Sequence, residues 1–97
     1  MSAGTTLSDQ ARPVLLRGVR THWDAVRGNW VLLAPERAIA LDEIGAAILA
    51  ETDGETPFGE IVERLAAKYK APPEQIATDA RRFLTALIDR RMVEALP

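Results

Sequence analysis

The amino-acid sequence predicts an α+β domain of winged-helix-like form, in which a three-stranded antiparallel sheet is followed by three helices. Residues 19–41 contain three short β-favouring runs that are separated by turn residues. Residues 42–89 contain three stretches with apolar side chains at helical spacing, each opened by a helix start signal. The 97 residues, 47% of them hydrophobic, provide enough apolar surface for one modest core, so we expect one domain.

The N-terminal residues 1–11 are mostly small or polar, with a single internal leucine. This composition offers too little apolar surface to offset the entropy lost on ordering. We therefore expect a flexible tail or linker over residues 1–11, and the folded domain over residues 12–97.

The first strand is expected over residues 19–24, where polarity alternates along the chain. Val19, Thr21 and Trp23 share one face of such a strand, and we expect that face to point inward. Trp23 is accordingly predicted to be a core residue.

A hairpin and a third strand follow. Gly28 and Asn29 form a turn pair that accepts positive φ, and residues 30–33 resume a β-favouring apolar run. Pro35 ends this second strand, and the third, Arg37–Leu41, comes so soon afterwards that an antiparallel meander is the economical arrangement. One outer strand is left partly unpaired, and its open edge is a potential docking site.

The first helix is expected to begin after Asp42, whose carboxylate can accept hydrogen bonds from the free amides of the first turn. Leu41, Ile44 and Ile48 give its core stripe, and Gly54 suits the left-handed residue at its C-terminal end.

The second helix has Thr56 as its predicted cap and Pro57 at its first position. Its apolar residues are Phe58, Ile61, Val62, Leu65, Ala66 and Tyr69. Pro72 and Pro73 end it and open the third helix, Pro73–Asp89. The third helix carries an apolar stripe, widened on one side, made of Ile76, Ala80, Phe83, Leu84, Leu87 and Ile88. Residues 92–93 are expected to close the sheet or to pack beneath it.

The bulk composition argues against several function classes. A formal charge of −2, from 12 basic and 14 acidic side chains, gives no net field for nucleic acid or anionic membranes. Cysteine is absent, which excludes disulfides and thiolate chemistry and agrees with a cytoplasmic protein. The apolar run at residues 44–50 is far shorter than the roughly 20 residues that span a bilayer, so we expect no membrane anchor.

Catalytic, phosphate-binding and metal-binding signals are weak throughout the chain. His22, the single histidine, lies on the polar face of the first strand and has no evident partner. The carboxylates lie at helix starts or on polar helix faces, where capping and solubility explain them. No Gly-rich phosphate loop or metal-ligand spacing is present. We therefore expect a binding protein that is not an enzyme and has no cofactor or metal.

Two arginine pairs, Arg81-Arg82 and Arg90-Arg91, keep an alternative open. In a winged-helix arrangement the third helix occupies the position of a recognition element, so these arginines are compatible with nucleic-acid binding. Interleaved carboxylates such as Asp89 would cancel much of the required field. We treat a winged-helix nucleic-acid-binding protein as the alternative, and expect no nucleic acid as partner.

A family resemblance adds to this interpretation. The residues that carry it are Arg12-Pro13, Gly18-Val19-Arg20, Asp24, Arg27-Gly28, residues 30–37 (WVLLAPER), Leu41-Asp42 and the Ile-Val-x-x-Leu of residues 61–65. In these positions the chain closely resembles the PqqD family, from residue 12 to the C-terminus. The resemblance implies a non-catalytic peptide chaperone of pyrroloquinoline quinone biosynthesis. Such a chaperone binds the precursor peptide PqqA and presents it to the radical SAM enzyme PqqE.

The resemblance also implies where the peptide binds, which is between the third strand and the third helix. Strand addition along Arg37–Leu41 and apolar anchors from the helix then define the expected contacts. These are Arg37, Ala38, Ile39, Ala40 and Leu41 on the strand, and Ile76, Ala80, Arg81, Phe83, Leu84 and Leu87 on the helix.

Trp30 lies beside the hairpin turn, where core packing and a half-exposed position at an interface are both open. We assign it to a contact with the partner enzyme. A third hypothesis is a purely structural module that docks an enzyme through Trp30 without peptide. We expect a monomer, with a dimer through the open strand edge as the alternative.

Overall fold

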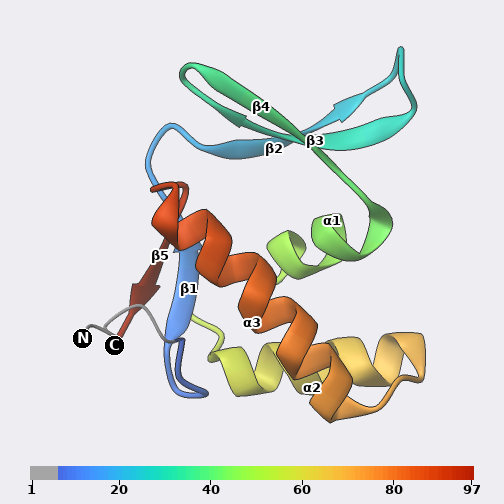
Figure 1. Cartoon of the computed structure of the whole chain (residues 1–97), viewed down its shortest axis with the longest axis vertical. Helices are drawn as coiled ribbons and strands as arrows, with labels where there is room; N and C mark the ends of the chain where they lie inside the picture. The colour runs from blue at the N-terminus through green and yellow to red at the C-terminus, as the bar shows by residue number, and fades with distance from the viewer. Residues whose placement is uncertain (1–6) are drawn as a thin grey trace.

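The structure is a computed structural model that describes residues 7–97 (Figure 1). Its elements follow in the order β1 (Arg12–Leu15), β2 (Arg20–Asp24), β3 (Asn29–Ala34), β4 (Arg37–Leu41), α1 (Glu43–Ala50), α2 (Phe58–Tyr69), α3 (Pro73–Asp89) and β5 (Val93–Leu96). The predicted α+β class, with a three-stranded antiparallel sheet followed by three helices, is confirmed. No helix of the described part of the chain is long and apolar enough to cross a bilayer.

The three-stranded sheet has the order β2-β3-β4 and lies above the helices in Figure 1. Its register pairs Trp23 with Trp30, Trp30 with Leu41, and Leu32 with Ile39. Leu32 is fully buried and Ile39 packs against the core, so the face that carries them rests on the helices. Among the described strands β4 pairs only with β3, which leaves its other edge free.

A second sheet, formed by β1 and β5, was not predicted. Arg12 pairs with Leu96 and Leu15 with Val93, 78 to 84 residues away along the chain. The expectation that residues 92–93 close the larger sheet is therefore wrong, because Val93 begins β5 in this separate sheet. The alternative expectation, packing beneath the sheet, agrees better with Met92, which is fully buried.

The N-terminal segment is more ordered than expected. Residues 1–6 of the predicted tail lie outside the described residues, but residues 7–11 pack on the domain. Leu7 is 1% exposed, and its carbonyl oxygen accepts a hydrogen bond from Arg81 Nε at 2.8 Å. Arg81 Nη2 also forms an ion pair with Asp9 at 2.8 Å. The prediction of a flexible tail is wrong for these residues, because Leu7 fills a place in the core.

The same segment caps α2. The helix begins after Pro57 and has no side-chain cap. The backbone N–H of Phe58 donates to the carbonyl oxygen of Ala11 at 2.8 Å, and that of Gly59 donates to Asp9 O at 2.9 Å. A helix start needs acceptors for its free amides, and here they come from a distant stretch of backbone.

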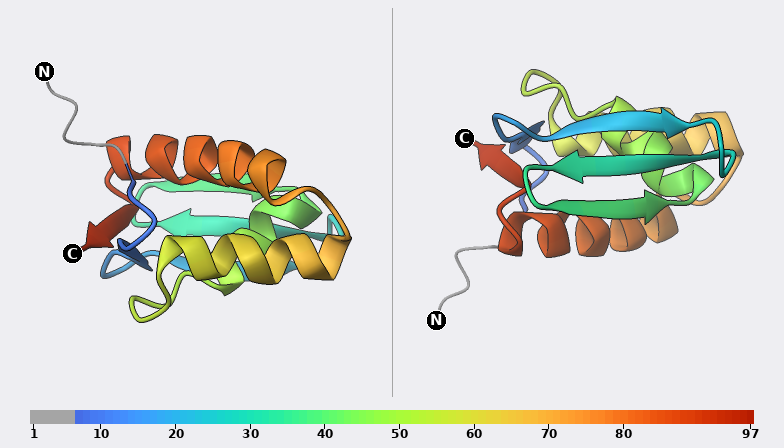
Figure 2. Two further views of the ribbon diagram at one scale, coloured as in Figure 1. Left: turned by 90° about the horizontal axis from the view of Figure 1, so that it is seen from below. Right: turned by 90° about the horizontal axis from the view of Figure 1, so that it is seen from above.

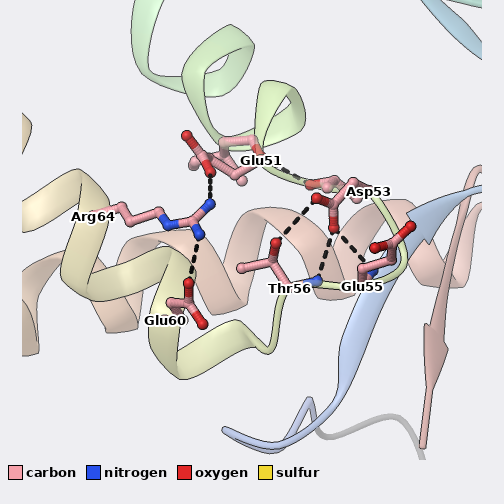
Figure 3. A network of polar contacts seen from close by, with 8 residues as sticks. Glu51, Asp53, Glu55, Thr56, Glu60 and Arg64 are labelled. Carbon is pink, nitrogen blue, oxygen red and sulfur yellow. Dashed lines mark hydrogen bonds and ion pairs between the residues drawn. The ribbon is translucent and has the colours of Figure 1, made fainter.

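Thr56, the predicted cap of α2, has another role (Figure 3). Its hydroxyl donates to Asp53 Oδ2 at 3.0 Å, while Asp53 Oδ1 accepts from the backbone N–H groups of Glu55 at 2.9 Å and Thr56 at 2.8 Å. These backbone hydrogen bonds lower the pKa of Asp53 below its ordinary value, because they favour the charged carboxylate. The α1–α2 connection is thus fixed by one aspartate.

Gly54 adopts φ +79° in this connection, three residues beyond the C-cap of α1 at Glu51. Its predicted place at the C-terminal end of α1 is therefore wrong. Its N–H donates to Pro13 O at 2.9 Å, and a Cβ atom there would lie 3.1 Å from Val14 Cγ2. Gly54 allows the connection to approach β1 closely.

The helices otherwise begin and pack largely as predicted. Asp42 caps α1 by accepting a hydrogen bond from Gly45 N at 2.7 Å, and Pro73 stands at the start of α3. The predicted stripe of α2 is buried except for the half-buried Tyr69. Ile44 is an error in the predicted stripe of α1, since it is 39% exposed while Leu49 is buried in its place.

Candidate functional site

The open edge of β4 faces the side of the molecule where α3 lies. In the view from above in Figure 2, β4 is the outer strand and α3 runs alongside it. The two-residue turn at residues 35–36 makes Ala34 and Arg37 its closing pair. Because hydrogen-bonded and non-hydrogen-bonded pairs alternate in an antiparallel ladder, Ile39 bonds to β3 and the backbone N–H and C=O groups of Ala38 and Ala40 point to the open edge.

Two close approaches place α3 beside β4, one from β4 itself and one from α1. At the start of β4, Arg37 Nη2 donates to the carbonyl oxygen of Arg90, the residue that ends α3, at 2.8 Å. Just past the end of β4, a Cβ atom on Gly45 would lie 3.3 Å from the ring of Phe83, so α1 and α3 approach closely there. We use the name β4–α3 groove for the surface between these contacts, which consists of the open edge of β4 and the accessible residues of α3 beside it.

The predicted site residues divide into two groups in this groove. Those with accessible surface are Arg37, Ala38, Ile39, Ala40, Ile76 and Phe83. Those in the core, at most 6% exposed, are Leu41, Ala80, Leu84 and Leu87. These four residues belong to the hydrophobic core cluster, so they offer the groove little surface, although Ala80 also lines the pocket between the helices described below.

Arg81 does not reach the groove either. With 100° per residue, it lies about 200° around α3 from Phe83. Its guanidinium stacks over the ring of Phe58 at 4.7 Å and binds the N-terminal segment at Leu7 and Asp9. The expected role of Arg81 as a groove residue is therefore wrong, since its charge is engaged in holding residues 7–11 in place. The same contacts remove it from any free basic surface.

The two tryptophans lie together at the far end of the hairpin. Trp23 is 47% exposed, so its prediction as a core residue is wrong, and Trp30 is 41% exposed. Their rings pack edge to face with centroids 5.5 Å apart. Trp23 is on the inward face as expected, but near the turn the sheet extends beyond the core. Both rings line a hollow of about 580 Å³ whose floor includes Ala46, Ala47, Ala50 and Tyr69.

A smaller pocket of about 200 Å³, which the sequence did not indicate, lies between the three helices. Its walls are Ile44, Ile48, Leu65, Tyr69, Ala71, Gln75, Ile76, Asp79 and Ala80. Each helix contributes part of the wall, so no single periodic stretch indicates it. The one local signal of this pocket is Ile44, an exposed apolar residue that was predicted to belong to the core.

Two features of the titratable groups in the described residues bear on chemistry, namely metal-ligand clusters and shifted pKa values. No three His, Asp or Glu side chains gather as a metal site within residues 7–97, and His22 is exposed. The groups with shifted pKa values are Asp53 and Arg64, both in the network of Figure 3. Arg64 bridges Glu51 at 2.9 Å and Glu60, and these acids raise its pKa. Both shifts are explained by structural contacts.

Comparisons with known proteins agree on one family. The profile described as "Coenzyme PQQ synthesis protein D (PqqD)" matches residues 29–93. A protein of Rhizobium meliloti named PqqA binding protein is 52% identical over 80 residues, which is 82% of each chain. Its namesake in Bradyrhizobium diazoefficiens is 44% identical over 85 residues, covering 88% of this chain and 82% of the relative.

Two solved structures are also similar. The solution structure of the PqqD part of Methylobacterium extorquens PqqCD superposes with a TM-score of 0.81 at 37% identity, covering 96% of this chain and 99% of that one. It is described as a functional, stand-alone recognition element for ribosomally made, modified peptides. The crystal structure of PqqD from Xanthomonas campestris gives a TM-score of 0.56 at 38% identity, covering 89% and 96%.

Proposed function

Because the chain belongs to the PqqD family, we propose that it is a non-catalytic chaperone that binds the precursor peptide PqqA and presents it to the radical SAM enzyme PqqE. The names of the relatives and the description of the Methylobacterium structure support peptide binding. The observation in this chain that carries the proposal is the open edge of β4 beside the exposed part of α3.

The proposed binding mode is addition of a peptide strand to β4. Ala38 and Ala40 offer their backbone N–H and C=O groups along the open edge, and small side chains there do not obstruct an approaching backbone. Ile39 and Phe83 are half-buried and provide apolar surface on the two walls of the groove. An extended peptide would gain hydrogen bonds from one wall and side-chain contacts from both.

Hydrogen bonds alone are too weak for this function. Micromolar binding needs a net free energy of about −8 kcal/mol. Four strand hydrogen bonds at about 0.5–1.5 kcal/mol each cannot supply it once the peptide's ordering cost is subtracted. Two or three buried peptide side chains at about 1.5–3 kcal/mol each would close the difference. The peptide must therefore carry apolar anchors for pockets near the groove.

The backbone mode is tested by proline substitution at the open edge. Ala38→Pro and Ala40→Pro each remove one outward N–H group without removing a bond to β3, and edge strands tolerate proline. We expect PqqA binding, measured by calorimetry, to weaken at least about tenfold, which corresponds to 1.4 kcal/mol for a lost and unreplaced hydrogen bond.

Valine at the same positions is the matched control, because it keeps the N–H group and favours strand geometry. Valine variants should bind PqqA nearly as the unmodified protein does. Equal binding by the Ala38→Pro, Ala40→Pro and valine variants would refute strand addition at β4. Amide resonances of the labelled protein should confirm that each variant keeps its fold.

For the enzyme we propose a contact at the tryptophan pair, since Trp30 and Trp23 are exposed aromatic rings of the kind that anchor interfaces. The pair lies at the turn end of the hairpin, and β4 continues past it into α1. Trp30→Ala should weaken binding to PqqE while leaving binding of PqqA unchanged. Loss of peptide binding in this variant would contradict the separation of the two surfaces.

A further inference from the structure

The small pocket between the helices lies further along α3 from Phe83, the residue of α3 that borders the β4–α3 groove. Phe83, Asp79 and Ile76 are spaced i, i−4 and i−7, so they follow one face of α3. Phe83 meets α1 at Gly45, and Ile44 beside it lines the pocket together with Ile76 and Asp79. The seven helical steps from Phe83 to Ile76 span about 10 Å, a distance that about three residues of extended chain cover.

The size and lining of this pocket suit one apolar side chain. Its volume of about 200 Å³ is below that of typical small-molecule sites, which begin at about 300 Å³. An apolar cavity of about 150 Å³ already holds a benzene ring. Six of its nine lining residues are apolar: Ile44, Ile48, Leu65, Ala71, Ile76 and Ala80. The pocket therefore has room for a branched aliphatic or an aromatic side chain.

Charges of opposite sign lie at the two ends of the surface that runs from the start of β4 to the pocket. Arg37 and Arg90 lie at the start of β4, whereas Asp79 lines the pocket beyond its end and Glu43 opens α1. None of these four side chains forms an ion pair with another described residue. Asp79 is the one charged residue in the pocket lining. A cationic group seated over the pocket would therefore meet an uncompensated carboxylate.

We propose that the pocket defined by Ile44, Ile76 and Asp79 receives one apolar side chain of the bound precursor peptide, and that Asp79 selects a lysine or arginine next to that side chain. This inference rests on the proposed function, since the occupant is the peptide that pairs with β4. Binding in the pocket would anchor one peptide side chain in addition to the strand hydrogen bonds, and it would fix the direction of the peptide chain. A basic residue of the peptide would lie at the pocket end, and an acidic residue at the other end would lie near Arg37.

The charge is tested with Asp79→Lys and synthetic PqqA. Because an ion pair of this exposure contributes about 0.2–1 kcal/mol and a reversal adds repulsion, affinity should fall about three- to tenfold. Changing the neighbouring basic residue of the peptide to glutamate should restore binding to the Asp79→Lys variant and weaken binding to the unmodified protein. Asp89→Lys is the control, since it makes the same change on another face of α3.

The pocket itself is tested by filling it. Ala71→Leu places a larger side chain in the lining and should weaken PqqA binding about tenfold. Methyl labelling of Ile44, Ile48 and Ile76 should show direct contacts with one apolar peptide side chain in nuclear Overhauser spectra of the complex.

The outcomes separate this inference from the proposed function. If β4 amides shift on titration while the labelled pocket methyls do not, and Asp79→Lys behaves like Asp89→Lys, the pocket inference is overturned and strand addition stands. If unmodified protein does not bind PqqA, both fail together. Weakened binding by Asp79→Lys without rescue by the charge-reversed peptide overturns the selective role of Asp79.

Discussion

The N-terminal segment provides the sharpest test of the fold, because sequence composition and structure disagree about it. In the structure Leu7 is 1% exposed and belongs to the core, although it lies in a stretch that reads as a flexible tail. Leu7→Ala removes its apolar side chain and leaves a cavity beneath the segment. If residues 7–11 were a tail, the same substitution would have no effect on stability.

The expected loss can be estimated from burial. A buried leucine replaced by alanine costs about 2–5 kcal/mol in the free energy of unfolding. A value near the lower end, about 2–3 kcal/mol, is expected because a segment near a chain end can relax around the cavity. For a domain of this size each kcal/mol lowers Tm by about 4–8 °C, so Tm should fall by roughly 8–24 °C.

The assay is urea denaturation followed by circular dichroism of the helices, with thermal melts beside it. Leu7→Met is the control, since a swap of similar volume costs less than about 1.5 kcal/mol. Arg81→Ala should also destabilise the domain, because Arg81 binds Leu7 O and Asp9. A loss below about 0.5 kcal/mol for Leu7→Ala, the size typical of surface substitutions, would refute the packing of this segment.

Three further predictions concern the connection and the alternative function. Gly54→Ala should lower stability by about 1–3 kcal/mol in urea, because φ is +79° and the new Cβ would lie 3.1 Å from Val14; a neutral result would contradict that geometry. The pKa of Asp53 is lowered in the folded state, so its contribution is complete above the unfolded value of 3.8 and is lost as pH falls through the folded value. Urea midpoints between pH 7 and 2 should therefore drop at the acid end, and less so for Asp53→Asn. Duplex DNA should show no binding at low salt, since Arg81 is engaged by Asp9; a steep salt-dependent affinity would instead favour the nucleic-acid alternative.

Local signals in the sequence predicted the elements that depend on neighbouring residues. Asp42 caps the helix that follows it, and the alternation in residues 19–24 gave a strand with the correct inward face. The pairing of β1 with β5 depends on residues about 80 positions apart and has no local signature. For the same reason the backbone acceptors that replace Thr56 as the cap of α2 could not be found from a capping pattern.

The candidate site was predicted only in outline. An open strand edge follows from three closely spaced strands, and the structure has one on β4, although β2 at the other side of the sheet also pairs only with β3 among the described strands. Which part of the apolar stripe of α3 faces the groove depends on how the helix is rotated, and periodicity does not fix the rotation. Leu84 therefore entered the predicted site although it is core, and Arg81 entered it although it lies on the opposite flank from Phe83.

The short sheet of β1 and β5 determines where a fused protein would be attached to the domain. Its register places Arg12 beside Leu96, and Arg12 Nη2 donates to the carbonyl oxygen of Pro97 at 2.7 Å. In Figure 1 this sheet lies at the lower left, away from the α2–α3 connection at the lower right. A protein fused after β5 would therefore be attached at this corner. Such a fusion would leave the pocket between the helices and the edge of β4 open.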